Sequence, residues 1–168
     1  MMLDKLHYLT IQASIKNIHT VERFVENICD YYNINTDYFG HILTAVTEAV
    51  ENAIFHGNNN NLNKKVFLRF DITPEGYIFR IKDEGAGFNL DAVPDPTDYK
   101  ADFSKTEGRG LFIIKTLADV VNFYDNGACV ELIFKISSIT KQMSDDRINT
   151  YMSNIKSKQD VVKHKETE

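Results

Sequence analysis

Short segments in which apolar and polar residues alternate, or in which apolar residues lie between turn signals, occur five times and predict β-strands. The expected strands cover residues 9–15, 66–70, 77–83, 120–124 and 128–136. Pro74-Glu75-Gly76 joins the second strand to the third, and Asn126-Gly127 lies between the fourth and the fifth. Turn-forming residues at these places predict two β-hairpins and therefore antiparallel pairing.

Apolar residues at intervals of three and four predict three helices between these strands. The first and third are expected over residues 17–32 and 111–118. The second begins where Thr36 or Asp37 can cap its first turn and runs to about Phe55, with Gly57 as the expected C-cap. Its wide apolar stripe consists of Ile42, Leu43, Val46, Ala49, Val50, Ala53 and Ile54.

The expected order of elements is β-α-α-β-β-loop-α-β-β, which predicts an α+β fold. We expect a two-layer sandwich with one mixed, mostly antiparallel sheet and helices on one face. Residues 58–63 are expected to form a polar loop. Residues 89–107, with two prolines and four aspartates, predict a long loop that acts as a lid or a mobile segment. Residues 1–138 then form the domain, and residues 139–168 form a polar, flexible tail with a weak helix around residues 145–155.

The composition fits one globular domain and excludes several classes of protein. The chain has 168 residues, of which 43% are apolar, and a net charge of −5. This acidic balance argues against broad, non-specific binding of nucleic acid, which needs a basic surface. No apolar run approaches the length of about 20 residues that a membrane span needs, and no secretory pattern is visible, so we expect a soluble cytoplasmic protein. Cys29 and Cys129 lie in apolar patterns and are expected to be reduced, buried thiols.

Three short polar segments stand at the ends of expected elements. The first is Glu48-Ala-Val-Glu-Asn52 in the second helix, where Glu48 and Asn52 are four residues apart and share one face. Because the apolar stripe of this helix is wide, the pair is expected at its edge or along a cleft. The alternative is two solvated residues on an amphipathic helix. Glu51 points about 100° away from Asn52 and is expected to be solvated.

The second segment is Asp83-Glu-Gly85-Ala-Gly87-Phe88, which follows an expected strand. A carboxylate such as Asp83 can accept a hydrogen bond from the exocyclic amino group of adenine, which guanine lacks at that position. The alternative is an aspartate that forms a turn through a local bond to the backbone. A calcium loop is disfavoured, because the second and third carboxylates at calcium spacing are missing.

The third segment, Gly108-Arg-Gly110-Leu111, opens the last expected helix. Free N–H groups and the helix dipole make such a start attractive to phosphate, whereas the alternative is a flexible joint between loop and helix. Lys105 and Arg109 are candidate neighbours of a phosphate, or else solvated charges. The P-loop pattern is absent, so a phosphate site here would be of another type.

In this order the three segments resemble the ATP-binding fold shared by sensor histidine kinases, type II topoisomerases, heat-shock chaperones and mismatch-repair ATPases. Within that group the chain is most similar to the small anti-sigma-factor serine kinases. The resemblance covers about residues 9–136, and it is closest in residues 46–58 (VTEAVENAIFHGN) and 81–88 (IKDEGAGF).

The resemblance implies a role for each matching residue. Asn52 would coordinate Mg²⁺ through its amide oxygen, and Glu48 would orient or deprotonate the attacking hydroxyl. Asp83 would bind adenine, with Gly85 and Gly87 letting the backbone approach the nucleotide. The remaining ATP-binding positions would be Lys105, Gly108, Arg109, Gly110 and Leu111.

The chain departs from the family pattern in two places. The family usually has a threonine after the glycine of the last hairpin, where it supports adenine recognition, and this chain has Ala128. A basic residue common in the kinases before Gly108 has no clear match unless Lys105 serves. His56 matches a family histidine at the helix end, for which a capping or packing role is expected rather than chemistry.

The resemblance implies a cytoplasmic, ATP- and Mg²⁺-dependent protein serine/threonine kinase that acts as an anti-sigma factor. Its partners would be a sigma factor and an anti-anti-sigma-type protein that it phosphorylates, and it would form a homodimer without direct contact to nucleic acid or membrane. One alternative is a nucleotide-responsive protein-binding module without kinase activity. Another is a detached ATPase domain of a histidine kinase, although His7, His19 and His41 lie outside a long helical hairpin. Topoisomerase- or chaperone-like ATPases are disfavoured, because their large transducer domains exceed this length.

Overall fold

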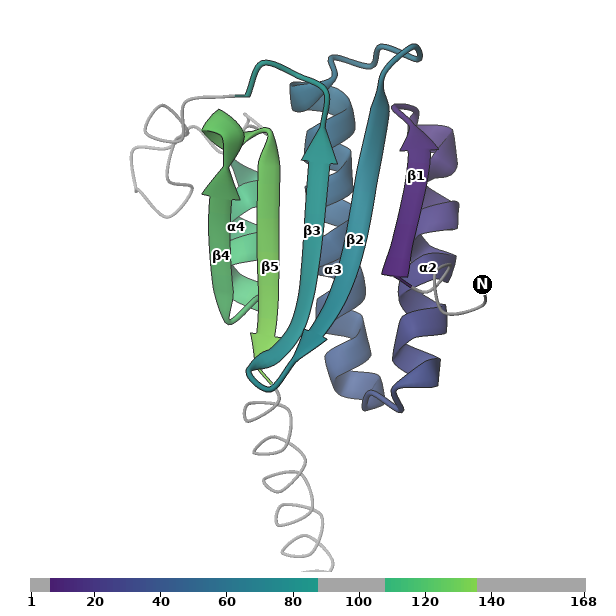
Figure 1. Cartoon of the computed structure of the whole chain (residues 1–168), viewed down its shortest axis with the longest axis vertical. Coiled ribbons are helices and arrows are strands. Elements are labelled where there is room, and N and C mark those ends of the chain that lie inside the picture. Colours follow the sequence, from purple (N-terminus) through teal and green to yellow (C-terminus); the bar gives the residue numbers. More distant parts are fainter. Residues whose placement is uncertain (1–6, 88–107, 136–168) are drawn as a thin grey trace, which may run out of the picture.

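The computed structural model describes residues 7–87 and 108–135, which fold into two layers (Figure 1). A five-stranded sheet forms one layer, and the helices of the described residues cover one of its faces. The strands are β1 (Tyr8–Gln12), β2 (Lys65–Thr73), β3 (Gly76–Asp83), β4 (Val120–Tyr124) and β5 (Cys129–Lys135). The helices are α2 (Ile18–Tyr31), α3 (Thr36–Asn52) and α4 (Arg109–Leu117). This arrangement confirms the expected α+β sandwich and the order of its elements.

The sheet has the strand order β1-β2-β3-β5-β4. Each pairing between the described strands is antiparallel, so the predominance of antiparallel pairing is as expected, and none of these pairs is parallel. Both expected hairpins are present, β2 with β3 and β4 with β5. Alternation along β2 turns Val66, Leu68 and Phe70 toward the helices, where all three are buried.

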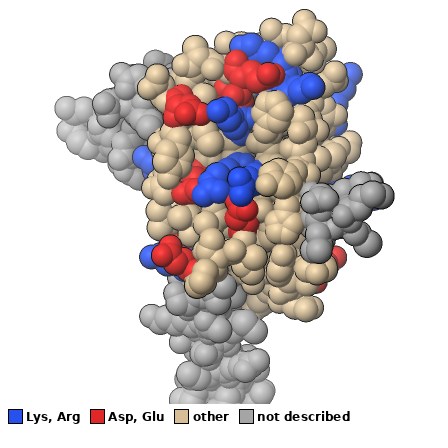
Figure 2. Space-filling model, in the orientation of Figure 1, with Lys and Arg blue, Asp and Glu red and all other residues tan. Residues whose placement is uncertain are grey.

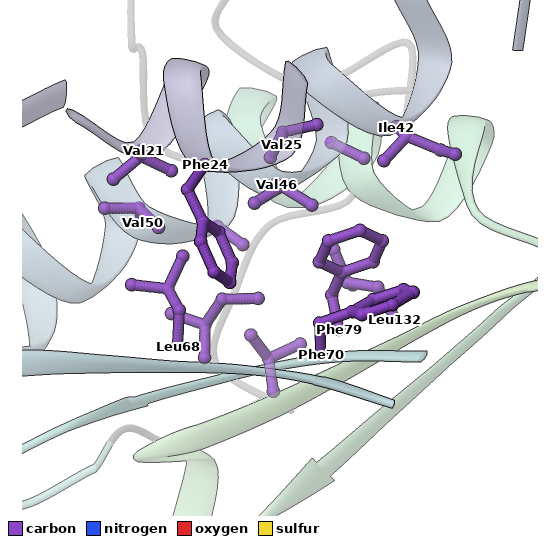
Figure 3. Close-up of a cluster of buried hydrophobic side chains, with 14 of the residues drawn as sticks. Val21, Phe24, Val25, Ile42, Val46, Val50, Leu68, Phe70, Phe79 and Leu132 are labelled. Atoms are coloured by element: carbon purple, nitrogen blue, oxygen red, sulfur yellow. The ribbon is translucent and has the colours of Figure 1, made fainter. Parts of the chain in front are cut away.

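Apolar side chains from both layers meet in one core (Figure 3). Its members include Val21, Phe24 and Val25 from α2, Ile42, Val46 and Val50 from α3, and Leu68, Phe70, Phe79 and Leu132 from the sheet. Burying a side chain of this size contributes about 1.5–3 kcal/mol. The core therefore holds α3 and β3, which carry the first and second polar segments, in fixed positions relative to each other.

The N-terminus of α3 is capped by Asn35 rather than by Thr36 or Asp37. Asn35 Oδ1 accepts a hydrogen bond from the Asp37 amide at 3.2 Å, which is the contact that defines an N-cap. Asp37 lies in the first turn, where its charge faces the positive end of the helix dipole. The predicted position of the N-cap was wrong by at least one residue, because Thr36 and Asp37 already belong to the helix.

Beyond Asn52 the helix continues as a wider π-helix, Ala53–Gly57. The Asn58 amide donates to the Ala53 carbonyl at 2.8 Å, five residues back along the chain. The expected C-cap at Gly57 is wrong, because the left-handed residues after the helix are Asn59 (φ 52°) and Asn60 (φ 56°). Asparagine tolerates this conformation better than most residues, so the turn does not require glycine.

The face of the sheet opposite the helices carries interspersed charges of both signs (Figure 2). Arg80 lies at its centre, 2.8 Å from Asp71 Oδ2 and 2.6 Å from Glu131 Oε2. Glu131 Oε1 accepts further hydrogen bonds from Asn122 Nδ2 at 3.0 Å and from the Tyr124 hydroxyl at 3.3 Å. The neighbouring strands β2, β3 and β5 thus contribute an acidic, a basic and an acidic side chain to one network.

Several expectations concern other parts of the chain. The expected lid and tail, residues 89–107 and 139–168, lie outside the described residues. None of the helices in the described ranges is long and apolar enough to span a membrane. Both cysteines are free thiols, and Cys29 is buried as expected, but Cys129 is only half-buried because it lies on the face of the sheet away from the helices.

Candidate functional site

The side chains of Glu48 and Asn52 converge on Gly110 at the start of α4. A methyl group on Gly110 would lie 2.9 Å from Glu48 Oε2 and 3.1 Å from Asn52 Oδ1. Both side chains are half-buried, so they are not the pair of fully solvated residues that was the alternative expectation. The first and third polar segments, about 60 residues apart in the chain, therefore meet in space, and the glycine allows this close approach.

The start of α4 has the features of an anion-binding helix terminus. Gly108, the N-cap, has φ 87°, a left-handed conformation that favours glycine, and it provides no side-chain cap. The positive end of the helix dipole therefore lies next to Glu48 and Asn52. Arg109 is exposed and Leu111 is half-buried. Lys105, the other candidate phosphate neighbour, lies outside the described residues.

Asp83 ends β3 and is buried, with 7% of its surface exposed. Its amide donates to the Ala128 carbonyl at 3.0 Å, and its Oδ1 accepts from the Gly85 amide at 2.7 Å. Burial raises the pKa of Asp83, although the bond from Gly85 and the nearby charges of Lys64 and Lys82 oppose this rise. The local turn that was the alternative to a ligand-binding role is present, and its carboxylate is buried.

Two glycines make room for this carboxylate. A methyl group on Gly57 would overlap the Asp83 carboxyl group, and a methyl group on Gly85 would lie 2.7 Å from Asp83 Oδ1 and overlap the Gly57 carbonyl. Gly87 has φ 80°, and its α-carbon lies against the Asn126 carbonyl of the β4–β5 turn. Gly85 and Gly87 were expected to admit a ligand to the backbone. Their size also lets three segments of the chain pack together around Asp83.

Sequence reasoning missed Asn58, which is fully buried behind Asp83. Its Nδ2 donates to the Lys65 carbonyl at 2.9 Å, and its Oδ1 accepts from the Glu84 amide at 3.0 Å. Glu84 Oε2 in turn accepts from the Lys65 amide at 2.6 Å. Asn58 is the first of four consecutive asparagines, and nothing in the local sequence distinguishes it from the exposed Asn59, Asn60 and Asn61.

Comparison with known proteins places this chain in a family. Residues 11–134 match the model of the histidine kinase-like ATPase domain. The chain belongs to this family. The match covers α3, β3 and α4, the elements that carry the three polar segments.

Relatives of this ATPase domain include proteins named as serine-protein kinases and a protein named as an anti-sigma factor. The chain is 29% identical to the serine-protein kinase RsbW of Oceanobacillus iheyensis over 112 residues, which are 63% of this chain and 71% of the relative. It is 33% identical to the anti-sigma F factor of Anoxybacillus flavithermus over 101 residues, 58% of this chain and 69% of the relative. Its identity to the serine-protein kinase RsbW of Staphylococcus aureus (strain Newman) is 29% over 111 residues, 62% of this chain and 70% of the relative.

Two residues of this ATPase domain, Glu51 and His56, differ from their sequence-based expectations, and a third, Ala128, departs from the family pattern. Ala128, where the family usually has threonine, is buried and contacts Asp83 through its main-chain carbonyl. Glu51, expected in solvent, is half-buried, and this burial together with the Glu48 charge raises the pKa of its carboxyl group. His56 was expected to cap or pack, but its side chain is exposed at the end of the π-helix.

The oxygen atoms near Gly110 suit magnesium chemically. Among the described residues no group of three or more His, Cys, Asp or Glu side chains could hold a metal ion. Magnesium bound together with a nucleotide takes only one or two protein oxygens, because phosphate and water supply the remaining ligands. Asn52 Oδ1 and Glu48 Oε2 are hard oxygen donors beside the same point of α4, so they fit this limited requirement.

Proposed function

We propose that this protein is an anti-sigma factor and an ATP-dependent protein serine/threonine kinase, whose substrate is an anti-anti-sigma-type protein. The names of the relatives support the kinase part and the anti-sigma part of this proposal. The observation that carries the kinase activity is the convergence of Glu48 and Asn52 on Gly110 at the N-terminus of α4. A carboxylate, an amide oxygen and a helix dipole are groups that can support phosphoryl transfer around a γ-phosphate.

At the phosphate end, each group has a distinct role. Asn52 would hold Mg²⁺ through Oδ1, and the ion would supply positive charge beside the phosphate oxygens. Glu48 accepts a hydrogen bond from the serine or threonine hydroxyl of the partner and orients it toward the γ-phosphate. The N-terminus of α4 faces the phosphates, with Arg109, exposed on its first turn, available as a further cation.

At the base end, Asp83 binds adenine. Its carboxylate accepts a hydrogen bond from the exocyclic amino group, and Gly57 and Gly85 leave the space in which the carboxylate lies. Because Asp83 is buried, a charged hydrogen-bond acceptor here gains strength from the low local dielectric. A base with a carbonyl oxygen at the same position is rejected, since two acceptors then face each other.

The test compares two neighbouring glutamates on α3. With Mg²⁺, labelled ATP and an anti-anti-sigma-type protein from the same organism, Glu48→Gln should bind ATP normally but transfer phosphate at least about 100-fold more slowly. Glu51→Gln is the matched control, because Glu51 is half-buried on the same helix, whereas the atoms nearest to the Gly110 position belong to Glu48 and Asn52. Unchanged transfer by Glu48→Gln would refute the assigned role of Glu48.

Ala128 motivates a second candidate, a nucleotide-responsive binding module without kinase activity. The side chain of Ala128 has no hydroxyl group to support the bound base, although its carbonyl still receives the Asp83 amide. In that case ATP would change the affinity for a sigma factor without phosphate transfer. Equal affinity for the sigma factor with and without Mg²⁺·ATP would exclude this candidate.

A further inference from the structure

We infer that Asn58 is a positioning residue for base recognition, because it ties the Asp83–Glu84 peptide to the end of the helix that carries Glu48 and Asn52. The inference rests on the proposed function and adds a residue to it. Asn58 follows the π-helix and has an exposed fraction of 0%. A fully buried polar side chain requires partners of its own, and both of its partners are main-chain groups of other elements.

The first contact of Asn58 reaches the residue after Asp83. Asn58 Oδ1 accepts from the Glu84 amide at 3.0 Å, so the peptide that joins Asp83 to Glu84 is held from the helix layer. Next along the chain, the Gly85 amide donates to Asp83 Oδ1 at 2.7 Å. Asn58 thus holds the peptide before Glu84, and the next peptide carries the Gly85 amide that bonds to Asp83, so the direction of the carboxylate depends on backbone that Asn58 anchors.

The second contact closes the arrangement on the other side. Asn58 Nδ2 donates to the Lys65 carbonyl at 2.9 Å, and the Lys65 amide donates to Glu84 Oε2 at 2.6 Å. Asn58, Lys65 and Glu84 therefore form a closed set of hydrogen bonds between the π-helix, the start of β2 and the end of β3. We call this set the Asn58 bridge.

The Asn58 bridge connects the two ends of the nucleotide site. Asn52 at the phosphate end is six residues before Asn58, and the backbone between them is helical without a break. Gly57, directly before Asn58, contacts the Asp83 carboxyl group. The distance from the phosphate groups to the base-binding carboxylate is thus set by one short segment, and this distance must match the length of the nucleotide.

The experiment uses a nucleotide pair that reports only on the base. Inosine triphosphate carries a carbonyl oxygen where ATP has the exocyclic amino group, so the ratio of the two affinities measures the Asp83 contact. We expect wild type to prefer Mg²⁺·ATP by about tenfold or more, as measured by calorimetry on the full chain. Asn58→Ala should reduce this preference toward onefold, mainly by lowering the affinity for ATP, because the Asp83 carboxylate is no longer directed at the base.

A matched asparagine provides the control for general destabilisation. Asn122 donates a hydrogen bond to Glu131 on the opposite face of the sheet, so Asn122→Ala also removes a partner of a buried group. It should retain the full preference for ATP even if it unfolds at lower denaturant concentration. A folded Asn58→Ala protein with wild-type preference overturns the inference, whereas failure of wild type to bind either nucleotide overturns the proposed function itself.

A milder change keeps the test decisive if Asn58→Ala does not fold. Glu84 is exposed, so Glu84→Ala removes its bond to the Lys65 amide without creating a cavity. The preference for ATP should fall in Glu84→Ala and remain in Glu84→Gln, which keeps an oxygen acceptor but loses the charge. Equal preference in wild type and both Glu84 variants would overturn the inference.

Discussion

The carboxyl group of Asp83 lies against the α-carbon of Gly57, in the space that a side chain at position 57 would occupy. The end of the helix layer and the end of β3 are therefore in direct contact at the residue proposed to read the base. A glycine at this place is required by packing, since its backbone is not left-handed.

Gly57→Ala should displace the Asp83 carboxylate, because the new methyl group would overlap it. We expect the free energy of unfolding to fall by about 1–3 kcal/mol, as in other overpacked sites. Affinity for Mg²⁺·ATP should fall by about tenfold or more, since a hydrogen bond to a charged group is lost. Denaturant titration and calorimetry measure the two effects.

Gly40→Ala is the control for this substitution. Gly40 lies within α3, and nothing surrounds the place of its missing methyl group within 4 Å. Alanine there should raise the free energy of unfolding by about 0.5–1 kcal/mol and leave ATP affinity unchanged. Equal behaviour of the two alanine variants would show that the Asp83–Gly57 contact has no special importance.

Asp83→Asn should raise stability at neutral pH while it weakens ATP binding. Burial raises the pKa of Asp83, so its charged form is less stable in the folded protein than in the unfolded chain. A neutral amide of the same shape removes this cost, and we expect a gain of up to about 1 kcal/mol in the free energy of unfolding. Lower stability of Asp83→Asn at pH 7 would contradict this account.

The same shift predicts how this gain changes with pH. Because the folded-state pKa of Asp83 is the higher one, the folded protein takes up the proton first as the pH falls. Wild type gains stability from this uptake. The difference in the free energy of unfolding between wild type and Asp83→Asn should therefore narrow as the pH falls from 7 to about 4. Urea titrations of both proteins across this range measure the difference directly.

Gly110→Ala should affect chemistry more than folding. The new methyl group would lie 2.9 Å from Glu48 Oε2, the end of a side chain that can move away at low energetic cost. We expect the free energy of unfolding to change by less than about 1 kcal/mol, because alanine also favours the helix. Phosphate transfer should slow by about tenfold or more once Glu48 is displaced. A variant with normal transfer and normal stability would indicate that Glu48 acts elsewhere.

Arg80→Ala should destabilise the protein without affecting the nucleotide. Glu131 is buried on the outer face of the sheet; burial alone would raise its pKa, but hydrogen bonds from Asn122 and Arg80 lower it. Without Arg80, this buried carboxylate lacks one of its hydrogen-bond donors. We therefore expect the free energy of unfolding to fall by about 1–3 kcal/mol. Arg69→Ala removes a more exposed partner of Asp71 and should cost less than about 1 kcal/mol.

Most of the layer structure could be predicted from the sequence, because the helices and hairpins are determined by local periodicity and turn residues. The three polar segments could also be identified, since glycine and acidic residues at element ends are local signals. Their meeting at Gly110 could not be derived from spacing alone. It depends on the packing of α3 against α4, which the contacts of Glu48 and Asn52 record.

The wrong expectations for Gly57 and Asn58 share a physical origin. Gly57 was interpreted as a helix cap, and Asn58 as part of a polar loop, because only their sequence neighbours were considered. Their actual partners, Asp83, Glu84 and Lys65, lie between 7 and 26 residues away along the chain. A polar residue with distant main-chain partners has no signature in composition or periodicity.

The π-helix between Asn52 and Asn58 has one further consequence. A π turn contains about one residue more than an α turn, and each residue of an α-helix advances by about 100°. If Ala53–Gly57 kept all its residues but formed an ordinary α-helix, Asn58 would be rotated by about 100°, out of the interior. At this point in the chain, evolution can exchange side chains that face solvent, such as those of Phe55 and His56, far more readily than it can tighten the wide turn around an unchanged number of residues.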